Sequence, residues 1–503
     1  MTDWLSLKSG SDVRGTAVGD NATLTADIAK ALGMAFAQWV AAKKNKTVQT
    51  LRIAIGRDSR ITGPGLLQAV ADGIIRCGAS VSDFGMCTTP AMYMSTITQG
   101  FEVDGAVMIT ASHHPWDKNG LKFFTSEGGL ESKDVETLLR VARDLKPEES
   151  APSGSVHSED FLPVYQKQLA DRIRSGLGTE ADKPLAGLHV VVDAGNGAGG
   201  FYADMLQGLG ANTAGSQFLD PDGIFPNHIP NPENAQAIAS LQSAVLRAGA
   251  DLGVIFDTDC DRAAVVDADG KEINRNRLIA LISAILLEDK PRQVIVTDSV
   301  TSSGLSLFIR QKGGDHYRYK RGYRNVIDEA IRLNAEGADC PLAIETSGHA
   351  ALRENHFLDD GMYLVTVLIV KAMQMKKQGK TLGSLIADLK EPAESTEIRL
   401  NITDPDFRIC GQEAIQRVLD HAEVTDDWHV SPDNREGVRI SFDLDGVPDS
   451  AWFLLRLSVH DPVLPLNAES DIPGGIRTML TGLASVLDGI HGIDLTPLLV
   501  VIR

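Results

Sequence analysis

Three aspartates alternate along a short segment that directly follows an apolar run. Asp257, Asp259 and Asp261 come after residues 252–256. If this segment stays extended, alternate side chains point to one side, and three carboxylates so close repel one another unless a cation lies between them. Hard oxygen ligands select Mg²⁺, Mn²⁺ or Ca²⁺. The spacing therefore predicts a divalent-metal site, with a solvated acidic turn as the alternative. An EF-hand is excluded because its sixth position is Arg262 instead of glycine.

A serine with basic neighbours is the second candidate for chemistry. Ser112 follows a predicted strand and lies beside His113 and His114, with Lys122 shortly after. An alkyl hydroxyl is a weak nucleophile at neutral pH and needs a base, a metal or cationic neighbours. This segment supplies such groups, so Ser112 is a candidate nucleophile. The alternative is a helix N-cap with surface histidines, and the Gly-x-Ser-x-Gly pattern of the α/β-hydrolases is absent.

Other polar clusters fit a phosphorylated sugar. Glu345, Ser347 and His349 offer a carboxylate, a hydroxyl and an imidazole that suit vicinal sugar hydroxyls, although this motif alone favours an ordinary polar loop. Basic clusters suggest small phosphorylated ligands because arginine forks match phosphate oxygens, although each cluster alone favours solvated surface charge. The clusters are Arg57 with Arg60, Lys320 with Arg321 and Arg324, and Arg456 next to Ser458.

A glycine-rich segment at residues 195–200 satisfies the dinucleotide-binding pattern G-x-G-x-x-G, and Asp220 follows at the appropriate distance. The pattern is weak by itself. In the middle of the chain, a tight turn between a strand and a helix is the favoured interpretation over binding of a nicotinamide dinucleotide.

Alternating strands and helices must position these groups. Short apolar runs end in polar clusters and lead into amphipathic helical stretches, which predicts βαβ units and a largely parallel sheet. In such sheets the loops at the carboxyl ends of strands carry function. The C-terminal part reads instead as α+β, with strands over 396–402, 437–444 and 452–459 and a helix over 476–487. The predicted strands before it are 51–55, 105–109, 188–192, 252–256, 294–297 and 341–344, and a helix is predicted over 65–77.

The chain has 503 residues, enough for about three or four domains. Linker-like segments rich in Pro, Glu, Ser and Gly lie at 145–158, 271–277 and 390–395. They predict four domains. The first, 1–158, carries the Ser112 loop, and the second, 159–272, carries the aspartates. The third, 273–390, carries the Glu345 loop, and the fourth, 391–503, carries the Arg456 loop.

The composition narrows the classes of partner. With 48 Lys+Arg, 67 Asp+Glu, a net charge of −19 and no basic stripe, we expect no nucleic-acid partner. The longest apolar run, 278–287, is too short to cross a bilayer, and the N-terminus does not resemble a signal peptide. Five cysteines without CxxC spacing argue against a disulfide framework or a zinc site and fit a reducing cytoplasm.

Taken together, these loops resemble those of the α-D-phosphohexomutase family, which includes phosphoglucomutases and phosphomannomutases. The resemblance covers nearly the whole chain in the family's order, and several ordered matches are more specific than any one. The matching segments are the N-terminal loop 10–15, the strand end 56–60, the phosphoserine loop 110–115, residues 222–228 with 230–233, the metal loop 257–262, the third-domain loops 320–324 and 345–349, and residues 359–361.

The resemblance implies three similar α/β domains with mixed sheets and a smaller C-terminal α+β domain around a central cleft. It implies a phosphoserine at Ser112 and one Mg²⁺ per chain, held by Ser112, Asp257, Asp259 and Asp261. Further roles follow by position: Arg14, Lys122 and His349 in proton transfer or electrostatics, Glu345 and Ser347 on sugar hydroxyls, Lys320 and Arg262 as substrate-side cations, and Arg456 and Ser458 on a phosphate.

Two positions depart from the family pattern. His114 stands where many members carry asparagine, which is a minor change. The family's usual Arg-Pro-Ser-Asn/Gly-Thr-Glu-Pro appears at residues 456–462 as Arg-Leu-Ser-Val-His-Asp-Pro, so a threonine hydroxyl is missing. His460 is a candidate replacement donor, and a stronger one when protonated.

The implied activity is reversible phosphoryl transfer between the 1- and 6-positions of a glucose or mannose phosphate. It runs through a hexose 1,6-bisphosphate, which also serves as activator. The alternatives are a phosphoglucosamine mutase, a Mg-dependent sugar phosphatase and a non-catalytic protein that binds sugar phosphates. Residues 254–259 are similar to the start of a haloacid-dehalogenase-type phosphatase, although Asp261 and Arg262 depart from that pattern. The sequence leaves open whether the sugar is glucose, mannose or both, and it specifies no oligomeric state.

Overall fold

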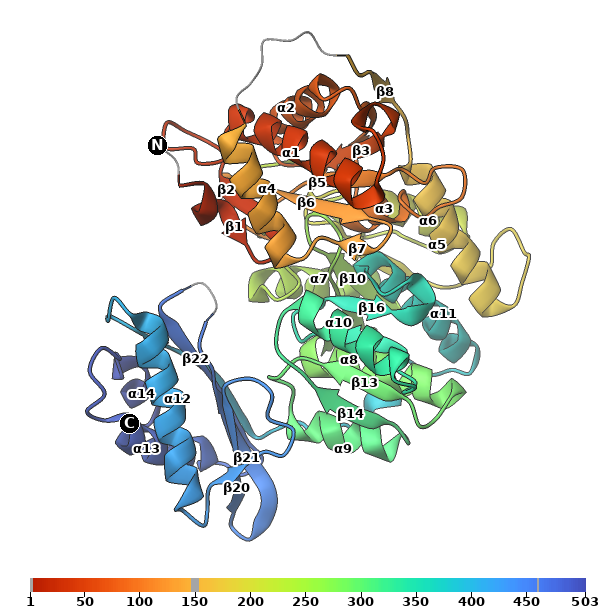
Figure 1. Cartoon of the computed structure of the whole chain (residues 1–503). Coiled ribbons are helices and arrows are strands. Elements are labelled where there is room, and N and C mark those ends of the chain that lie inside the picture. Colours follow the sequence, from red (N-terminus) through yellow and green to blue (C-terminus); the bar gives the residue numbers. More distant parts are fainter. Residues whose placement is uncertain (1–2, 146–152, 459–460) are drawn as a thin grey trace. The chain divides into compact units, whose positions relative to one another are not determined.

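The computed structural model describes residues 3–145, 153–458 and 461–503. It forms two compact units (Figure 1). The first unit combines Met1–Asn274 with Ser347–Ser384, and the second combines Arg275–Thr346 with Leu385–Arg503. Among the described residues, no helix has both the length and the apolar character that a membrane crossing requires.

The first unit begins with a mixed sheet in the order β1-β2-β6-β5-β3-β4-β8, and β7 pairs with β6. Strands β3, β4, β5 and β8 run parallel, whereas β6 joins β5 and β2 antiparallel. The strands are β1 (Lys8–Ser9), β2 (Asp12–Thr16), β3 (Arg52–Arg57), β4 (Ser80–Met86), β5 (Gly105–Ile109), β6 (Lys118–Thr125), β7 (Gly128–Gly129) and β8 (Val156–Ser158).

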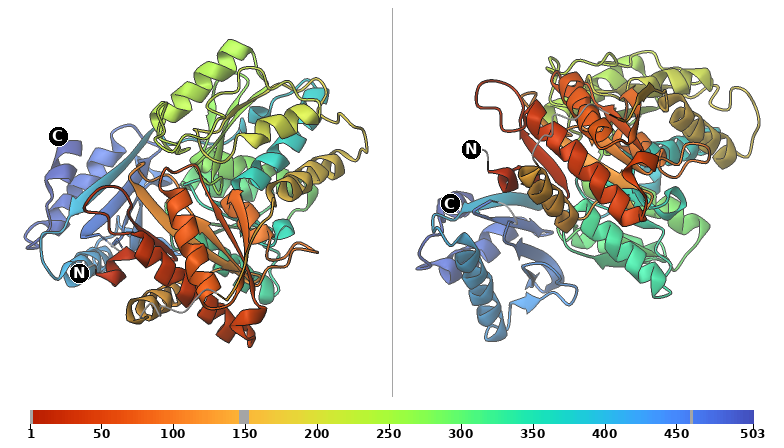
Figure 2. Two further views of the ribbon diagram at one scale, coloured as in Figure 1. Left: turned by 90° about the horizontal axis from the view of Figure 1, so that it is seen from above. Right: turned by 45° about the horizontal axis from the view of Figure 1, so that its top comes forward.

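Alternation along the central strands determines which helices cover which face of this sheet. Ile53 and Ile55 of β3 and Val107 and Ile109 of β5 belong to one core with α1, α2 and α4, and α1 and α2 lie side by side in both views of Figure 2. Helix α3 contacts β3, β5 and β6. The helices are α1 (Ala26–Lys44), α2 (Gly63–Arg76), α3 (Thr89–Met94) and α4 (Ser132–Asp144).

A second sheet in the first unit has the order β12-β11-β10-β9, with β9 and β10 parallel and β10 and β11 antiparallel. Helix α11 packs against both α5 and β11. The remaining elements of this unit are α5 (Leu162–Leu177), β9 (Val190–Asp193), α6 (Phe201–Gly208), α7 (Ala235–Ala248), β10 (Leu252–Phe256), β11 (Ala263–Asp267), β12 (Glu272–Ile273), β16 (Ala350–Leu352), β17 (Leu358–Asp359) and α11 (Gly361–Lys377).

The second unit contains the parallel strands β14-β13-β15 and an antiparallel sheet in the order β18-β22-β21-β20-β19. The antiparallel sheet shares a core with α12, α13 and α14. The elements are α8 (Arg275–Asp289), β13 (Val294–Thr297), α9 (Ser303–Gln311), β14 (Asp315–Arg318), α10 (Tyr323–Ala335), β15 (Leu342–Ile344), β18 (Glu394–Asn401), α12 (Phe407–Glu423), β19 (His429–Val430), β20 (Val438–Leu444), β21 (Val447–Leu455), β22 (Val463–Ser470), α13 (Gly475–Leu487) and α14 (Thr496–Val501).

The predicted fold class is confirmed: α/β elements with mixed sheets precede a C-terminal α+β part. The first sheet is less parallel than the alternation predicts, because β6 returns antiparallel from the Ser112 loop. Helix α2 begins two residues earlier than predicted because Pro64 fits its first turn. The linker expected at 271–277 contains β12 and the start of α8, and the division between the two compact units, after Asn274, falls within it. The three predicted boundaries between the four domains stay predictions.

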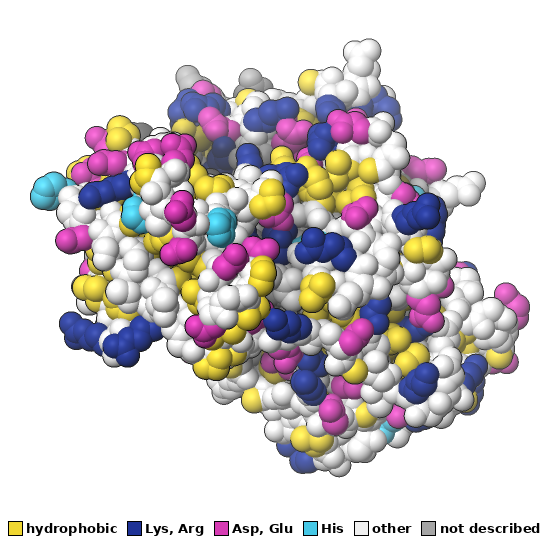
Figure 3. Space-filling view, turned by 90° about the horizontal axis from the view of Figure 1, so that it is seen from below, with side chains coloured by type: hydrophobic (Ala, Val, Ile, Leu, Met, Phe, Trp, Pro, Cys, Tyr) yellow, Lys and Arg dark blue, Asp and Glu magenta, His cyan; other side chains and the backbone are white. Residues whose placement is uncertain are grey.

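On the face drawn in Figure 3, basic side chains are scattered among acidic ones and do not form a continuous stripe. The five cysteines are all free thiols.

Candidate active site

The three aspartates of the predicted metal loop lie together and are buried. Their loop joins β10 to β11, and at least one carboxylate oxygen from each lies within 4.8 Å of those of the other two. Asp257 and Asp259 are fully buried and Asp261 nearly so, so the alternative of a solvated acidic turn is wrong. One oxygen each of Asp259 and Asp261 accepts no hydrogen bond from any described residue. Buried carboxylates with spare oxygens fit a hard divalent cation.

Burial and mutual repulsion perturb these carboxyl groups. Burial, followed by the charges of Asp261 and Asp259, raises the pKa of Asp257 to about 8. Burial alone would also raise the pKa of Asp261, but the ammonium of Lys122 holds that pKa below its usual range. Lys122 is itself buried; its Nζ lies 3.2 Å from Asp259 and bonds more closely to Asp261. The aspartate loop thus already binds one cationic side chain of the protein, the ammonium of Lys122.

Ser112 lies directly against this cluster, although 145 positions separate it from Asp257 along the chain. Its hydroxyl donates to Oδ2 of Asp257 at 2.6 Å, and Nη2 of Arg262 lies 3.4 Å from the same hydroxyl oxygen. Nδ1 of His113 is 3.3 Å away. Ser112 has a φ of +49°, a left-handed backbone conformation that non-glycine residues seldom adopt. Both structural motifs expected to do chemistry therefore meet at one buried point.

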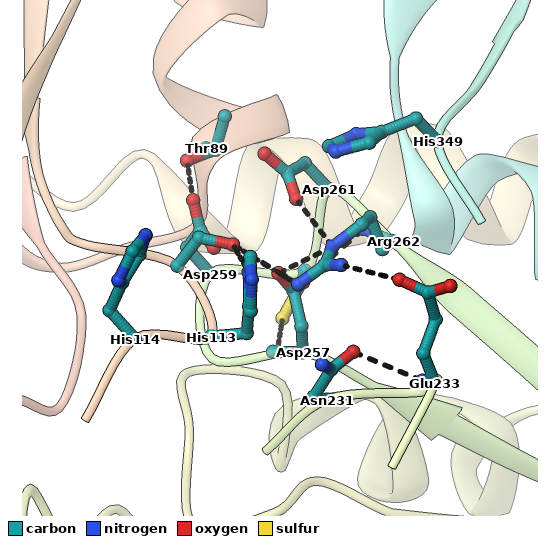
Figure 4. A network of polar contacts seen from close by, with 12 residues as sticks. Thr89, His113, His114, Asn231, Glu233, Asp257, Asp259, Asp261, Arg262 and His349 are labelled. Atoms are coloured by element: carbon teal, nitrogen blue, oxygen red, sulfur yellow. Dashed lines mark hydrogen bonds and ion pairs between the residues drawn. The ribbon is translucent and has the colours of Figure 1, made fainter. Parts of the chain in front are cut away.

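Arg262, Thr89 and Glu233 surround the aspartates (Figure 4). The guanidinium of Arg262 lies 3.2 Å from Asp257 and 3.9 Å from Glu233, and Arg262 is almost fully buried. Thr89, the first residue of α3, donates its hydroxyl to Asp259 at 2.5 Å. Thr89 was not among the residues predicted from the sequence, and Glu233 was indicated only as part of the matching segment 230–233, without a role. The Thr-Thr-Pro helix start after β4 was the available signal for Thr89.

His349 approaches the same cluster from the segment before β16. Its Nδ1 lies 2.5 Å from Oδ2 of Asp359, and Asp261, His349 and Asp359 form a second close group of potential ligand atoms. Burial would lower the pKa of His349, but the carboxylates of Asp359 and Asp261 outweigh it and raise that pKa to about 9. The imidazole is therefore protonated at neutral pH and directed by a carboxylate.

Arg14 lies on β2, opposite Gly120 of β6, two positions from Lys122. Its Nη2 forms an ion pair with Asp12 at 2.9 Å, and its buried Nε has no hydrogen-bond partner among the described residues. The structure therefore brings together, within the first unit, Arg14, Ser112, Lys122, Asp257, Asp259, Asp261, Arg262 and His349.

The glycine-rich segment forms a tight turn that supports the metal loop. The backbone N of Ala198 donates to the carbonyl of Thr258 at 2.9 Å, and a Cβ on Gly197 would lie 2.6 Å from that carbonyl oxygen. Gly195 has a φ of +53°. The turn interpretation is thus confirmed, with the turn packed against the backbone of the aspartate loop.

Arg60 corrects the expectation of solvated surface charge at residues 57–60. Its side chain is 0% exposed. The guanidinium donates to four backbone carbonyls of the Ser112 loop and pairs with Asp58 at 3.3 Å. The short Gly-Arg-Asp-Ser-Arg segment did not reveal those partners because they lie more than 50 positions further along the chain.

The second unit holds Lys320, Glu345, Arg456 and Ser458 of the other predicted substrate residues. Glu345 accepts the backbone N–H of Gly322 at 2.6 Å, which joins its loop to Lys320, an exposed residue. Burial lowers the pKa of Arg456, and its buried Nε has no hydrogen-bond partner among the described residues. Ser458 accepts the backbone N–H of Asp461 at 3.2 Å. His460 lies outside the described residues. Ser347, in the first unit, is half-buried.

Comparisons with known proteins assign the family. Sequence models of the phosphoglucomutase/phosphomannomutase alpha/beta/alpha domains I, II and III match residues 6–144, 163–270 and 274–392. The chain is 32% identical over 469 residues to a phosphomannomutase/phosphoglucomutase of Pseudomonas aeruginosa, covering 93% of this chain and 92% of that protein. It is 30% identical over 480 residues to a phosphoglucomutase of Neisseria gonorrhoeae, covering 95% of each.

A solved structure supports the same family assignment. A phosphoglucomutase/phosphomannomutase family protein of Burkholderia thailandensis superimposes with a TM-score of 0.78 at 28% identity, covering 97% of this chain and 99% of that one. On the three domain matches, the full-length relatives and this structural likeness, the chain belongs to the α-D-phosphohexomutase family.

Proposed function

We propose that this protein is a phosphohexomutase that interconverts hexose 1-phosphate and hexose 6-phosphate of glucose, mannose or both. The observation that carries the proposal is the 2.6 Å hydrogen bond from the Ser112 hydroxyl to Asp257, inside a buried trio of carboxylates. A serine phosphorylated there would place its phosphoryl group beside a cation-binding loop. The relatives' names, phosphomannomutase/phosphoglucomutase and phosphoglucomutase, support the same reaction class.

In this proposal, phospho-Ser112 gives its phosphoryl group to a hexose monophosphate, forming a 1,6-bisphosphate. The bisphosphate reorients and returns its other phosphoryl group to Ser112, so the serine is regenerated in its phosphorylated form. Asp257, Asp259, Asp261 and an oxygen on Ser112 would hold one Mg²⁺, which neutralises charge on a phosphoryl group in transfer. Arg262 lies close enough to the serine hydroxyl to hold phosphoryl oxygens as they move.

Three cationic side chains are available for proton handling and electrostatics. The attacking sugar hydroxyl must lose a proton and the serine oxygen must be released, which requires a positioned acid and base. Lys122 and His349 are the candidates because each is held by carboxylates within the cluster. Arg14 has a spare buried N–H at the edge of the same group. We propose that it steers the substrate phosphate.

The remaining predicted residues would recognise the sugar and its second phosphate. Glu345 and Ser347 would bind sugar hydroxyls, and Lys320 would face the substrate phosphate. Arg456 and Ser458 would hold the non-reacting phosphate, with His460 as the proposed replacement for the family's threonine. The spare, buried Nε of Arg456 supports its part of this assignment.

Two further proposals concern the domain boundaries and the cellular location. The four domains are proposed to divide near residues 158, 272 and 390, close to where the family matches end at 144, 270 and 392. A cytoplasmic location is proposed because the five cysteines are free thiols, as a reducing compartment requires.

The deciding experiment combines product analysis with intact-protein mass spectrometry. Wild-type protein with Mg²⁺ is given glucose, mannose or glucosamine 1-phosphate together with the matching bisphosphate. We expect 6-phosphate product, little free phosphate and one phosphoryl group on the protein. Ser112→Ala should lose nearly all turnover and the phosphoryl group, whereas Ser95→Ala, a buried serine that donates only to Met92, should keep both. Stoichiometric phosphate release would indicate a phosphatase, and binding without phosphorylation a binding protein.

A further inference from the structure

One buried guanidinium holds the whole loop that carries Ser112. Nη2 of Arg60 donates to the carbonyls of Ser112 at 2.5 Å and His114 at 2.6 Å. Nη1 donates to the carbonyls of Pro115 at 2.7 Å and Lys118 at 2.8 Å. The loop runs from β5 to β6, so these four carbonyls cover nearly its full length. An arginine fork can serve four acceptors at once, which a single lysine ammonium cannot do in this geometry.

A second chain of hydrogen bonds connects the same arginine to the serine backbone. Asp58 accepts the backbone N–H of Arg60 at 2.9 Å and the hydroxyl of Thr110 at 2.7 Å. The hydroxyl oxygen of Thr110 in turn accepts the backbone N–H of Ser112 at 2.9 Å. Asp58 and Thr110 follow the parallel neighbours β3 and β5, which end side by side. Ser112 is therefore fixed through both its N–H and its carbonyl.

A loop from the second sheet covers this arrangement. Residues 222–228, which no proposed step uses, approach Arg60 through a bridge at Gly223, and the ring of Phe225 lies 5.2 Å from the guanidinium carbon. A Cβ on Gly223 would meet the backbone of residues 59–61, so the two segments touch. Excluding water strengthens the four carbonyl bonds because the interior dielectric is lower than that of water.

The hydrogen bonds to the backbone N–H and the carbonyl of Ser112 also determine where its hydroxyl points. Ser112 keeps a φ of +49°, which is costly for serine and persists only when its surroundings enforce it. The four carbonyl bonds and the Thr110 bond supply that enforcement, and the resulting backbone directs Oγ at Asp257.

We infer that Arg60 is the positioning residue of phosphoryl transfer: it fixes the Ser112 loop in the one backbone conformation that aims the serine oxygen at the metal loop. The inference rests on the proposed function. Loss of Arg60 should leave substrate binding largely intact, because its bonds within the described part of the chain go to backbone carbonyls and to Asp58, not to predicted substrate residues. Misplacing the reacting oxygen should slow transfer itself.

The test uses full-length Arg60→Lys and Arg60→Met with saturating bisphosphate and Mg²⁺. Misplacement of a reacting group by about 1 Å can cost about 100-fold, so we expect kcat to fall by about that factor in both variants. The KM for hexose 1-phosphate should stay within about threefold, because ground-state binding is not the affected quantity. The rate of phosphorylation of Ser112 by hexose 1,6-bisphosphate, followed by intact mass, should fall in parallel with kcat.

Arg52→Lys is the matched control. Arg52 begins the strand that ends near Arg60, and it also donates to a backbone carbonyl, that of Phe101 at 3.1 Å, and to Glu159 at 2.7 Å. This substitution should lower the melting temperature without changing kcat or the phosphorylation rate. If the role of Arg60 were purely structural, the Arg60 variants would behave like Arg52→Lys, with a lower melting temperature but a normal rate of phosphoryl transfer.

A milder pair keeps the inference testable if the Arg60 variants do not fold. Thr110→Val removes the hydroxyl that links Asp58 to Ser112, and Thr110→Ser restores it. We expect kcat to fall about 10-fold in the valine variant, the loss of about one hydrogen bond, and to return in the serine variant. Wild-type kcat in folded Arg60→Met, or in Thr110→Val, overturns the inference. If Ser112→Ala is inactive in that case, the proposed function stands; full activity of Ser112→Ala overturns both.

Discussion

The carboxylate of Asp359 holds Nδ1 of His349, and replacing that carboxylate tests whether the imidazole takes part in turnover. Oδ2 of Asp359 lies 2.5 Å from Nδ1 of His349, and Oδ1 accepts the backbone N–H of Ala350 at 3.1 Å. In Asp359→Asn the carbonyl oxygen can still accept from Ala350, so the amide nitrogen faces Nδ1. Nδ1 must then accept a hydrogen bond from that amide, which requires a neutral ring with its hydrogen on Nε2.

The structure sets the size of the effect. A hydrogen bond to a charged group contributes about 1.5–3 kcal/mol, and each ~1.4 kcal/mol in a barrier changes a rate about tenfold. If the protonated imidazole acts in the transition state, Asp359→Asn should lower kcat by about 10- to 150-fold. The overall fold should persist because the substitution preserves shape and the bond to Ala350. The KM should change little, since the carboxylate faces the imidazole.

The assay is initial-rate formation of hexose 6-phosphate at saturating bisphosphate, with phosphoserine content measured by intact mass. Glu354→Gln is the control, because Glu354 lies in the same segment, is exposed and forms its ion pair with Arg172, away from the imidazole. A folded, fully phosphorylated Asp359→Asn with the wild-type kcat would refute the reasoning. It would mean that the imidazole takes no part beyond packing.

Three further predictions concern the metal loop and the buried acids. Chelation by EDTA should stop turnover and lower the melting temperature, and Mg²⁺ should restore both; an unchanged melting temperature would argue against a cation among the aspartates. Thr89→Val, which removes the donor to Asp259, should weaken Mg²⁺ binding about tenfold in calorimetric titration, while Thr89→Ser should not. Burial raises the pKa of Asp360 to about 7 despite the bonds donated by Tyr363 and Tyr165. Because the folded state then binds this proton more tightly than the unfolded state, the free energy of unfolding should fall as pH rises from about 4 to 7, by at most about 4 kcal/mol. In Asp360→Asn the free energy of unfolding, measured by urea at pH 5 and pH 8, should depend less on pH. An equally steep pH dependence in the variant would contradict the assignment.

Local pattern was sufficient to find the groups that are proposed to react. Asp257, Asp259 and Asp261 follow a fully buried strand, and Ser112 follows another, so strand-end placement and residue type alone indicated them. The alternating texture also predicted the α/β class, because strand and helix periods are properties of a short window. Register between the strands could not be read this way. The antiparallel return of β6, which brings Lys122 to the cluster, depends on contacts across the sheet.

The supporting residues were misread because their partners lie far away along the chain. Arg60 was interpreted as surface charge, yet its side chain is fully buried against carbonyls 52 to 58 positions further on. Thr89 meets Asp259 across 170 positions. A basic or hydroxyl residue carries no local mark of whether it will face water or a backbone carbonyl. The resemblance to a family indicated that residues 56–60 mattered, but it assigned them no role.

The charges at the site explain why a metal ion and a phosphoryl group should bind together. Asp257, Asp259 and Asp261 face Lys122 and Arg262 in a volume almost closed to water. A divalent cation alone would add two positive charges to this buried group, and a phosphoryl dianion alone would add two negative ones. Each alone is costly in a medium of low dielectric. Added together they leave the net charge of the cluster unchanged, so each should raise the affinity of the site for the other. The buried lysine and arginine make that balance possible: without them, three carboxylates and a phosphorylated serine would repel one another whenever the cation left.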